Sequence, residues 1–520
     1  MAAVALASSA RPSKLRVGVF ADARAQPRWI VEALAQVAAS AFAEIAVIVT
    51  AAEARPRRAP LLQRAYARLD QWAFGPEPCE PVDLAAALAH STQITAHSWS
   101  AAVFPDLGLD VAFAVGEFDD AVLDGIARYG VWRFQADGFR EVADGEPLTA
   151  SGLTVRLAAG AAPRLAYQSW SRTYPMSAAR NRRELLGKTS QFAFRALREV
   201  HRSGRGWLEQ CRVFKSPENP DQGLRPILKI GGRIARRAFD KALYAEQWSL
   251  AFRFDNGPGD GREVPADLAG FTRIAQPRDR DWADPFALER SGRHFVFFEE
   301  LPYASGKAHI AMIEIGPDGA CSAPVRVLER DYHLSYPLLL EDDGALYMIP
   351  ETAQNRSVEL YRCVDFPLRW RLEKRLLSDV RCVDATVHRA ADRWWLFANA
   401  APGETRMYDD ELHLFHAGSL LGDWRAHPRN PVKSDARCTR PAGQLYWRNG
   451  ALYRPAQICV PRYGSGISLN RVLRLTAHEY AERQVARILP SGGNGTIGIH
   501  TVNRAGYLTV VDTFTRRRRI

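Results

Sequence analysis

The stretch SYPLLLEDDGALYMIPE, from Ser335 to Glu351, decides how the second half of the chain is interpreted. Its two apolar runs are separated by Asp342, Asp343 and Gly344. Strand-forming runs around such a turn are typical of a β-hairpin, because glycine accepts the positive φ that a tight turn requires. The stretch therefore predicts one hairpin, with Glu351 at the end of its second strand.

The same pattern of strand, turn and aromatic-rich strand recurs five times. The copies begin at Asp284, Tyr336, Asp384, Ala442 and Gly498. Their period is about 50 residues and leaves room for two more strands per copy, which is typical of a β-propeller. We therefore expect a five-bladed β-propeller over residues 245–515, in which Gln247–Phe254 supplies a strand that closes the last blade.

Polar residues gather at the heads of these hairpins, where the inner strands of a propeller converge on its axis. The repeated positions hold Asp284, Glu299, Glu351, Asp384, Asn399 and Gln457, and further polar residues stand near them in the sequence: Glu300, His309, Tyr336, Arg437, Arg440, Arg454, Tyr463 and His500. Acids and amides bind sugar hydroxyls, and aromatic rings stack on the C–H face of a sugar. The set predicts a carbohydrate site, although caps, inter-blade ion pairs and structural histidines would also explain individual members.

The N-terminal part alternates between strands and helices. Apolar runs predict strands at 15–20, 44–49, 109–115 and 130–134, and helical periodicity covers 27–40 and 119–130. This alternation predicts a parallel, Rossmann-like α/β sheet over residues 14–200. The first strand-to-helix turn, FADARAQP, contains no glycine, so the sequence lacks the glycine-rich dinucleotide-binding fingerprint.

Residues 201–244 form a basic connector with helical character. A basic amphipathic helix can lie on an anionic membrane surface. Such a helix can equally pack between two domains, and we favour this interpretation.

The composition bounds the remaining expectations. The chain has 520 residues, a formal net charge of +11 and seven cysteines without a CxxC pair. We expect reduced thiols, and no structural zinc site because Cys/His clusters are absent; whether the channel holds a metal stays open. We also expect a cytoplasmic location that extends to the membrane periphery, because the first residues make a poor signal peptide. A basic surface suits anions, but solvated arginines explain most of the charge, and we expect no nucleic-acid partner.

Residues 14–200 resemble the formyltransferase family, in the opening strand and helix and in LDVAFAV…IARYGVWRF. In that family an Asn, a His and a downstream Asp orient and polarise the formyl group. The matching positions here are Arg133 and Gln135, and no Asp occurs between Asp144 and Asp221. Since an amide does not exchange a proton near neutral pH, the resemblance implies a degenerate domain and argues against formyltransferase activity.

The propeller segment resembles the N-terminal propeller domain of plant glucosamine inositolphosphorylceramide transferases, through WADPF…FFEE, SYPLLLEDDGALYMIPET, VDATV…RWWLFAN, RPAGQLY…LYRPAQ and GIHTVN. Bacterial proteins of similar type join this propeller to a formyltransferase-like domain. More distantly it is similar to five-bladed arabinanases, levansucrases and invertases. Those enzymes imply a base or nucleophile at Asp284, and a general acid and a transition-state stabiliser at Glu351 and Asp384.

We therefore expect a carbohydrate-active enzyme of glycan or glycolipid assembly, such as polysaccharide biosynthesis, with glycosyl transfer at the propeller channel. Asp284, Glu351 and Asp384 are the candidate catalytic residues, and Arg440 or Arg454 would hold a sugar-linked phosphate. No cofactor is expected other than a sugar-nucleotide or phosphorylated sugar donor. A glycoside hydrolase and a non-catalytic sugar-binding or scaffold protein remain as alternatives.

Overall fold

The structure is a computed structural model that describes residues 13–52, 61–97, 107–116, 119–215, 223–255, 267–400, 408–490 and 495–519. The chain forms two compact units, and the division falls inside one helix, between Gly232 and Arg233. The basic connector expected at 201–244 contains this division. All seven cysteines are free thiols. Within the described ranges, no helix is long and apolar enough to cross a membrane.

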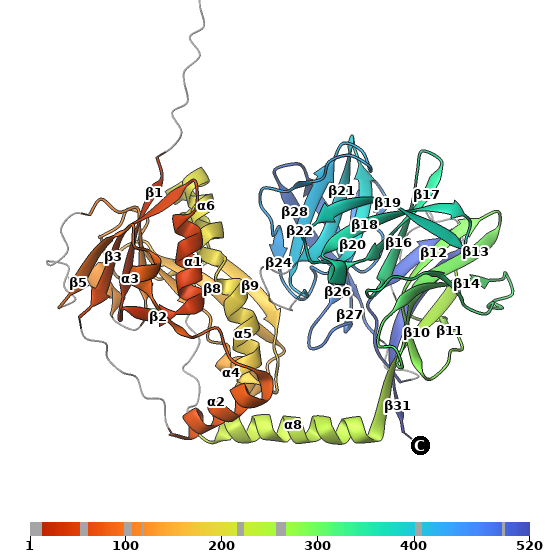
Figure 1. Ribbon diagram of the computed structural model, residues 1–520, viewed down its shortest axis with the longest axis horizontal. Coiled ribbons are helices and arrows are strands. Elements are labelled where there is room, and N and C mark those ends of the chain that lie inside the picture. The colour runs from red at the N-terminus through yellow and green to blue at the C-terminus, as the bar shows by residue number, and fades with distance from the viewer. Residues whose placement is uncertain are drawn as a thin grey trace, which may run out of the picture. The chain divides into compact units, whose positions relative to one another are not determined.

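The N-terminal unit contains a seven-stranded sheet in the order β5-β3-β1-β6-β7-β8-β9 (Figure 1). Its strands are β1 (Leu15–Ala21), β3 (Ala43–Ala51), β5 (Thr92–Ala96), β6 (Val111–Val115), β7 (Val131–Gln135), β8 (Leu148–Arg156) and β9 (Arg164–Arg172). The first five strands of this order pair in parallel, and β8 is antiparallel to β7. The predicted strands and the parallel α/β arrangement are therefore present.

Eight helices and a two-stranded ribbon accompany this sheet in the described residues. The helices are α1 (Arg28–Ala38), α2 (Leu61–Phe74), α3 (Leu84–Ala87), α4 (Phe139–Asp144), α5 (Ala178–Thr189), α6 (Phe192–Ser203), α7 (Arg205–Gln210) and α8 (Arg225–Leu243), and the ribbon pairs β2 (Ala25–Pro27) with β4 (Pro81–Asp83). The helix predicted over 119–130 is wrong, because only a 3-10 turn forms at Asp120–Leu123. Gly125 follows that turn with φ +84°, a left-handed conformation that ends helical winding.

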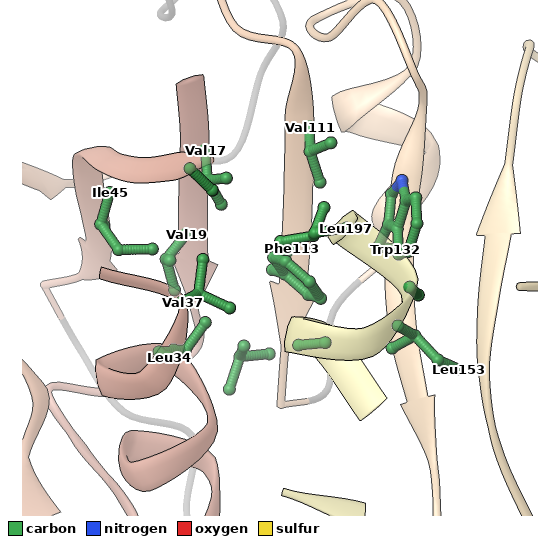
Figure 2. Packing of buried hydrophobic residues seen from close by; sticks show 14 of the residues in the cluster. Val17, Val19, Leu34, Val37, Ile45, Val111, Phe113, Trp132, Leu153 and Leu197 are labelled. Atoms are coloured by element: carbon green, nitrogen blue, oxygen red, sulfur yellow. The ribbon is translucent and has the colours of Figure 1, made fainter. Parts of the chain in front are cut away.

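The core of the N-terminal unit lies between the sheet and helices α1 and α6. Leu34 and Val37 of α1 pack with Val19 of β1, Phe113 of β6 and Leu197 of α6 (Figure 2). Each of these side chains is fully buried. Burial of one such side chain contributes about 1.5–3 kcal/mol, so the apolar periodicity that predicted α1 also fixes the helix on the sheet.

The second unit is a five-bladed β-propeller. Blade 1 contains β12 (Arg280–Arg290), β13 (Arg293–Pro302), β14 (His309–Ile315) and β15 (Val325–Leu328); blade 2 contains β16 (Ser335–Asp342), β17 (Ala345–Glu351), β18 (Ser357–Asp365) and β19 (Arg369–Ser378). Blade 3 contains β20 (Cys382–Ala390), β21 (Arg393–Ala400), β22 (Glu411–Ala417) and β23 (Arg425–Ala426), with β24 (Lys433–Ser434) on β22; blade 4 contains β25 (Tyr446–Arg448), β26 (Ala451–Ile458), β27 (Gly466–Leu475) and β28 (Tyr480–Ile488).

Blade 5 joins the two ends of the propeller sequence. It contains β30 (Val502–Ala505), β31 (Leu508–Arg518), β10 (Tyr244–Phe254) and β11 (Thr272–Arg273), with β29 (Thr496–Gly498) also on β31. Strand β10 pairs antiparallel with β31 from Tyr244–Arg518 to Phe254–Leu508. The predicted closing strand is therefore confirmed, and this pairing joins the first and last strands of the propeller sequence in one blade.

Candidate active site at the heads of the inner strands

Three inner strands carry the same β-bulge at their head. The pairing between β12 and β13 skips Asp284, the pairing in blade 2 skips Tyr336, and the pairing in blade 3 skips Asp384. The three skipped residues have φ values of 53°, 44° and 52°. A non-glycine residue in this left-handed region costs about 1–3 kcal/mol, and such strain collects at functional sites.

The bulges turn backbone amides toward the neighbouring blade. The Asp384 N–H donates to Glu351 Oε2 of blade 2 at 3.3 Å. The Asp284 N–H likewise donates to Asp512 Oδ2 of blade 5 at 3.1 Å. The repeated bulge therefore links the acids of consecutive blades into one group, which we call the axial cluster: Asp284, Glu299, Glu351, Asp384, Arg440 and His500.

His500 holds Asp284 in its ionised form. His500 Nε2 lies 3.0 Å from Asp284 Oδ1, and Nδ1 lies 2.9 Å from Asp512 Oδ2. Burial acts to lower the pKa of His500, but the two carboxylates outweigh burial and raise this pKa to about 10. Burial acts to raise the pKa of Asp284, but the His500 imidazolium and a 2.7 Å hydrogen bond from Thr501 hold it below its ordinary value.

Arg440 holds Asp384. Its Nε lies 2.6 Å from Asp384 Oδ2, and Gln457 Nε2 donates to the same oxygen at 2.7 Å. The guanidinium also reaches Asp409 Oδ1 at 3.3 Å and packs over the Tyr463 ring at 4.7 Å. Burial raises the pKa of Asp384, although Arg440 acts to lower it. The ionised form of Asp384 therefore depends on the Arg440 guanidinium.

The surroundings of Glu351 and Glu299 raise the pKa values of these side chains, whereas those of Asp284 lower its pKa. Burial and the nearby Asp384 carboxylate raise the pKa of Glu351 well above its ordinary value, and Arg440 Nη2 is 4.0 Å away. Burial also raises the pKa of Glu299, although His333 Nε2 lies 3.1 Å from its carboxyl. The cluster thus combines one carboxyl group whose pKa is lowered with carboxyl groups whose pKa values are raised.

The accessible edge of the cluster is formed by Glu299, Glu351 and Arg440, whose side chains are 13–15% exposed. The Asp284 and Asp384 side chains are 4% and 1% exposed. A ligand that approached the cluster would therefore meet Glu299, Glu351 and Arg440 first.

Two half-buried aromatic rings border the same group. The Trp248 ring centroid lies 4.2 Å from that of His500, and the Tyr463 centroid lies 5.0 Å from it. Trp248 comes from the closing strand β10. Acids beside aromatic faces form a surface that suits a sugar ring.

Asp284, His500 and Asp512 could also be considered as metal ligands, since their ligand atoms lie within 4.8 Å of one another. Both ring nitrogens of His500 face carboxylates, and the pKa of about 10 keeps the ring protonated. An imidazolium donates protons and does not coordinate cations. A metal would have to displace this proton, so these residues fit a buried ion-pair chain better than a metal centre.

The structure brings together most of the residues that the sequence selected. Asp284, Glu351, Asp384, Arg440, Gln457, Tyr463 and His500 lie in or against the axial cluster. Tyr336 heads an inner strand but is fully buried, where its hydroxyl contacts Thr386 Oγ1 and accepts from the Gly443 N–H. It therefore supports the strand heads and offers no exposed surface to a ligand.

Four selected residues have partners elsewhere. Glu300 points away from Glu299, as alternation along β13 requires, and bonds Arg280, Trp282 and His309. The His309 pairing with Glu300 is thus a structural contact. Arg454 is fully buried with Glu482. Arg437 pairs with Asp435.

Sequence reasoning missed His333, Asp409, Asp512 and Trp248. His333 and Asp409 lie in connections outside the repeat. Asp512 stands one residue before the repeated position, where its signal is an acid directly after the apolar residues Val510 and Val511, and it is fully buried.

A separate cavity of about 600 Å³ lies between the hairpin turns of blades 3 and 4. Its lining includes Asp392, Arg393, Trp447, Arg471 and Arg474. No residue of the axial cluster lines it. Its one acid, Asp392, pairs with Arg393 at 3.3 Å, so the cavity offers no pair of carboxyls for acid–base chemistry.

The propeller is similar in sequence to known proteins. Residues 273–501 match a family model described as the N-terminal part of glucosamine inositolphosphorylceramide transferase 1. The chain is 34% identical over 203 residues to the protein of that name from Oryza sativa subsp. japonica, which is 38% of this chain and 27% of the rice protein. It is 30% identical over 230 residues to the Arabidopsis thaliana protein, which is 44% and 30% of the two chains.

The chain therefore spans less than a third of the length of these curated relatives. The resemblance of the propeller to their N-terminal domain is confirmed. Among solved structures, a GH43 β-1,3-galactosidase with galactodeoxynojirimycin is 14% identical, covers 43% of this chain and 82% of its own, and gives a TM-score of 0.33.

Proposed function

We propose that this protein is a carbohydrate-active enzyme of glycan or glycolipid assembly that transfers a glycosyl group at the axial cluster. One observation carries the proposal: within one group of contacts the pKa of Asp284 is lowered by His500, while burial and Asp384 raise the pKa of Glu351 well above its ordinary value. Environments that push the pKa values of neighbouring carboxyl groups apart create the acid and the base that glycosidic chemistry needs.

Glu351 takes the role of the acid. Its proton passes to the oxygen of the leaving group as the glycosidic bond breaks, and Arg440 and the Asp384 N–H are placed to stabilise the carboxylate that remains. Asp384 lies against Arg440 and can face the positive charge that develops on the sugar.

Asp284 takes the role of the base. Oδ1 is occupied by His500 and Thr501, whereas Oδ2 makes no hydrogen bond or ion pair with any residue in the described ranges. That oxygen accepts the proton of an acceptor hydroxyl while the new C–O bond forms. Trp248 and Tyr463 would stack on the sugar ring.

Hydrolysis is the second candidate function, and the ion pairs of Arg440 and Arg454 favour it. The expected phosphate clamp would need a free guanidinium, but Arg440 is committed to Asp384 and Asp409, and Arg454 to Glu482. Hydrolysis, in which water replaces the acceptor hydroxyl, needs no phosphate clamp. Sugar binding without turnover is the third outcome.

For the N-terminal unit we propose a degenerate formyltransferase-like domain. Arg133 donates to the Gly116 carbonyl oxygen and Gln135 to Thr154 Oγ1, both on or beside β7. Neither side chain can act as an acid or base near neutral pH. The unit would then bind a ligand or a partner, and we further propose a cytoplasmic, membrane-peripheral location for the whole protein.

The test presents the purified protein with a panel of nucleotide sugars plus glycan acceptors, and with a panel of chromogenic glycosides. Release of nucleotide that Glu351→Gln abolishes would support transfer. Cleavage of a glycoside that the same change abolishes would support hydrolysis. Sugar binding by calorimetry without turnover in either panel would contradict an enzyme.

A further inference from the structure

Helix α2 exposes an apolar face that no other residue in the described ranges covers. The exposed fractions are 80% for Leu61, 57% for Leu62, 67% for Leu69 and 86% for Trp72. The opposite face is anchored, because Tyr66 packs against a buried cluster and Asp70 accepts the Ala179 N–H at 2.7 Å. The helix is thus held firmly with its apolar face outward.

Helix α8 continues this surface. Its Ile230 is buried in the cluster that Tyr66 contacts, so the first half of α8 lies beside α2, as Figure 1 shows. Leu228 is 64% exposed, and Leu224, just before the helix, is 49% exposed.

Cations flank both apolar faces. Helix α2 exposes Arg64 and Arg68. The part of α8 that belongs to the same unit, Arg225 to Gly232, carries Arg225 and Lys229 and no acid. Lys229 has an acidic neighbour, Asp144, at 3.0 Å. The surface is therefore apolar at its centre and strongly basic at its border.

An anionic lipid surface fits this pattern. Basic amphipathic helices with exposed Trp and Leu lie in the headgroup region, where indole rings are favoured and cations attract anionic lipids. A second copy of this chain would bring the same cations and a net charge of +11, so charge repulsion opposes self-association through this face.

We propose that α2 and the N-terminal half of α8 form an interfacial surface that docks this protein on an anionic lipid bilayer. The proposal stands independently of the chemistry at the axial cluster. It would bring the protein to the plane in which a lipid-linked substrate resides.

The test is flotation of the full chain with vesicles of equal parts phosphatidylglycerol and phosphatidylcholine, and with phosphatidylcholine alone. We expect binding to the anionic vesicles that is about tenfold weaker without phosphatidylglycerol and falls with added salt. The combined variant Leu69→Ser, Trp72→Ser and Leu228→Ser should weaken binding about tenfold or more. These side chains are exposed, so the fold should persist.

The matched control is Trp447→Ser with Leu473→Ser, which removes two half-exposed apolar side chains from the propeller and should leave flotation unchanged. Brominated lipid should quench part of the tryptophan fluorescence, and Trp72→Phe should abolish that part. Equal flotation of the triple variant and the wild type, or no flotation with phosphatidylglycerol, would overturn the proposal. A wild-type dimer that the triple variant converts to a monomer would assign the face to self-association instead. Turnover of soluble substrates should be equal in all variants.

Discussion

His500 Nε2 lies 3.0 Å from Asp284 Oδ1, and the contact joins blade 5 to blade 1. Because Nδ1 faces Asp512 at 2.9 Å, one imidazolium neutralises two buried carboxylates. His500→Gln would leave both acids without their cation. We expect the free energy of unfolding to fall by about 3–5 kcal/mol, the usual effect of breaking a buried ion pair. Urea denaturation measures this, with His478→Gln, an exposed histidine of blade 4, as the control.

The same histidine predicts how stability depends on pH. Its pKa in the folded protein is about 10, above the ordinary value of about 6.5. The stabilisation is therefore full below pH 6.5 and declines as pH rises from there toward pH 10. Urea denaturation across this range should show a steeper loss of stability for the wild type than for His500→Gln. Parallel curves for the two proteins would contradict the ion-pair chain.

Glu351 and Glu300 predict opposite results for the same chemical change. Glu351 has a raised pKa, so Glu351→Gln resembles its protonated form and should leave the unfolding free energy nearly unchanged. Turnover should fall by about 100-fold or more, because the proton donor is lost.

Glu300 has a pKa lowered to about 2, chiefly by its hydrogen bond to His309, so Glu300→Gln should destabilise the fold. Turnover per folded molecule should be retained. Denaturation curves and turnover rates of both variants check the contrast, and a larger loss of turnover in Glu300→Gln would invert the assignment.

Variants of Arg440 and Arg454 test whether sugar binding depends on the axial cluster. Both guanidinium groups pair with buried carboxylates, so Arg440→Met and Arg454→Met should each cost about 3–5 kcal/mol of stability. Of the two arginines, Arg440 belongs to the axial cluster and Arg454 does not. Calorimetric sugar titrations should therefore show weakened binding in Arg440→Met, partial recovery in Arg440→Lys, and wild-type affinity in Arg454→Met.

The repeat made much of the propeller predictable. Asp284, Tyr336 and Asp384 share one register position, and the ring brings such positions to the axis. Because the bulges at Asp284 and Asp384 turn backbone amides toward the neighbouring blade, Asp284 meets Asp512 and Asp384 meets Glu351. The sequence contains no direct signal of the bulge itself, since positive φ at Asp284 and Asp384 occurs without glycine.

The rest of the site depends on details that a repeat does not encode. Only one of Glu299 and Glu300 can face the axis, and the register of β13 decides which one. His333 and Asp409 come from connections with no counterpart in other blades. Arg454 looked equivalent to Arg440 because each precedes Pro-Ala, yet it lies inside strand β26 and points to Glu482.

The measurement that tests the central claim most directly is a crystal structure of Glu351→Gln soaked with a sugar that the wild type binds or turns over. We predict a sugar ring against Trp248 and Tyr463, with a hydroxyl within hydrogen-bond distance of Asp284 Oδ2. A sugar bound instead in the cavity between the turns of blades 3 and 4, or in the N-terminal unit, with the axial cluster unchanged, would contradict the account.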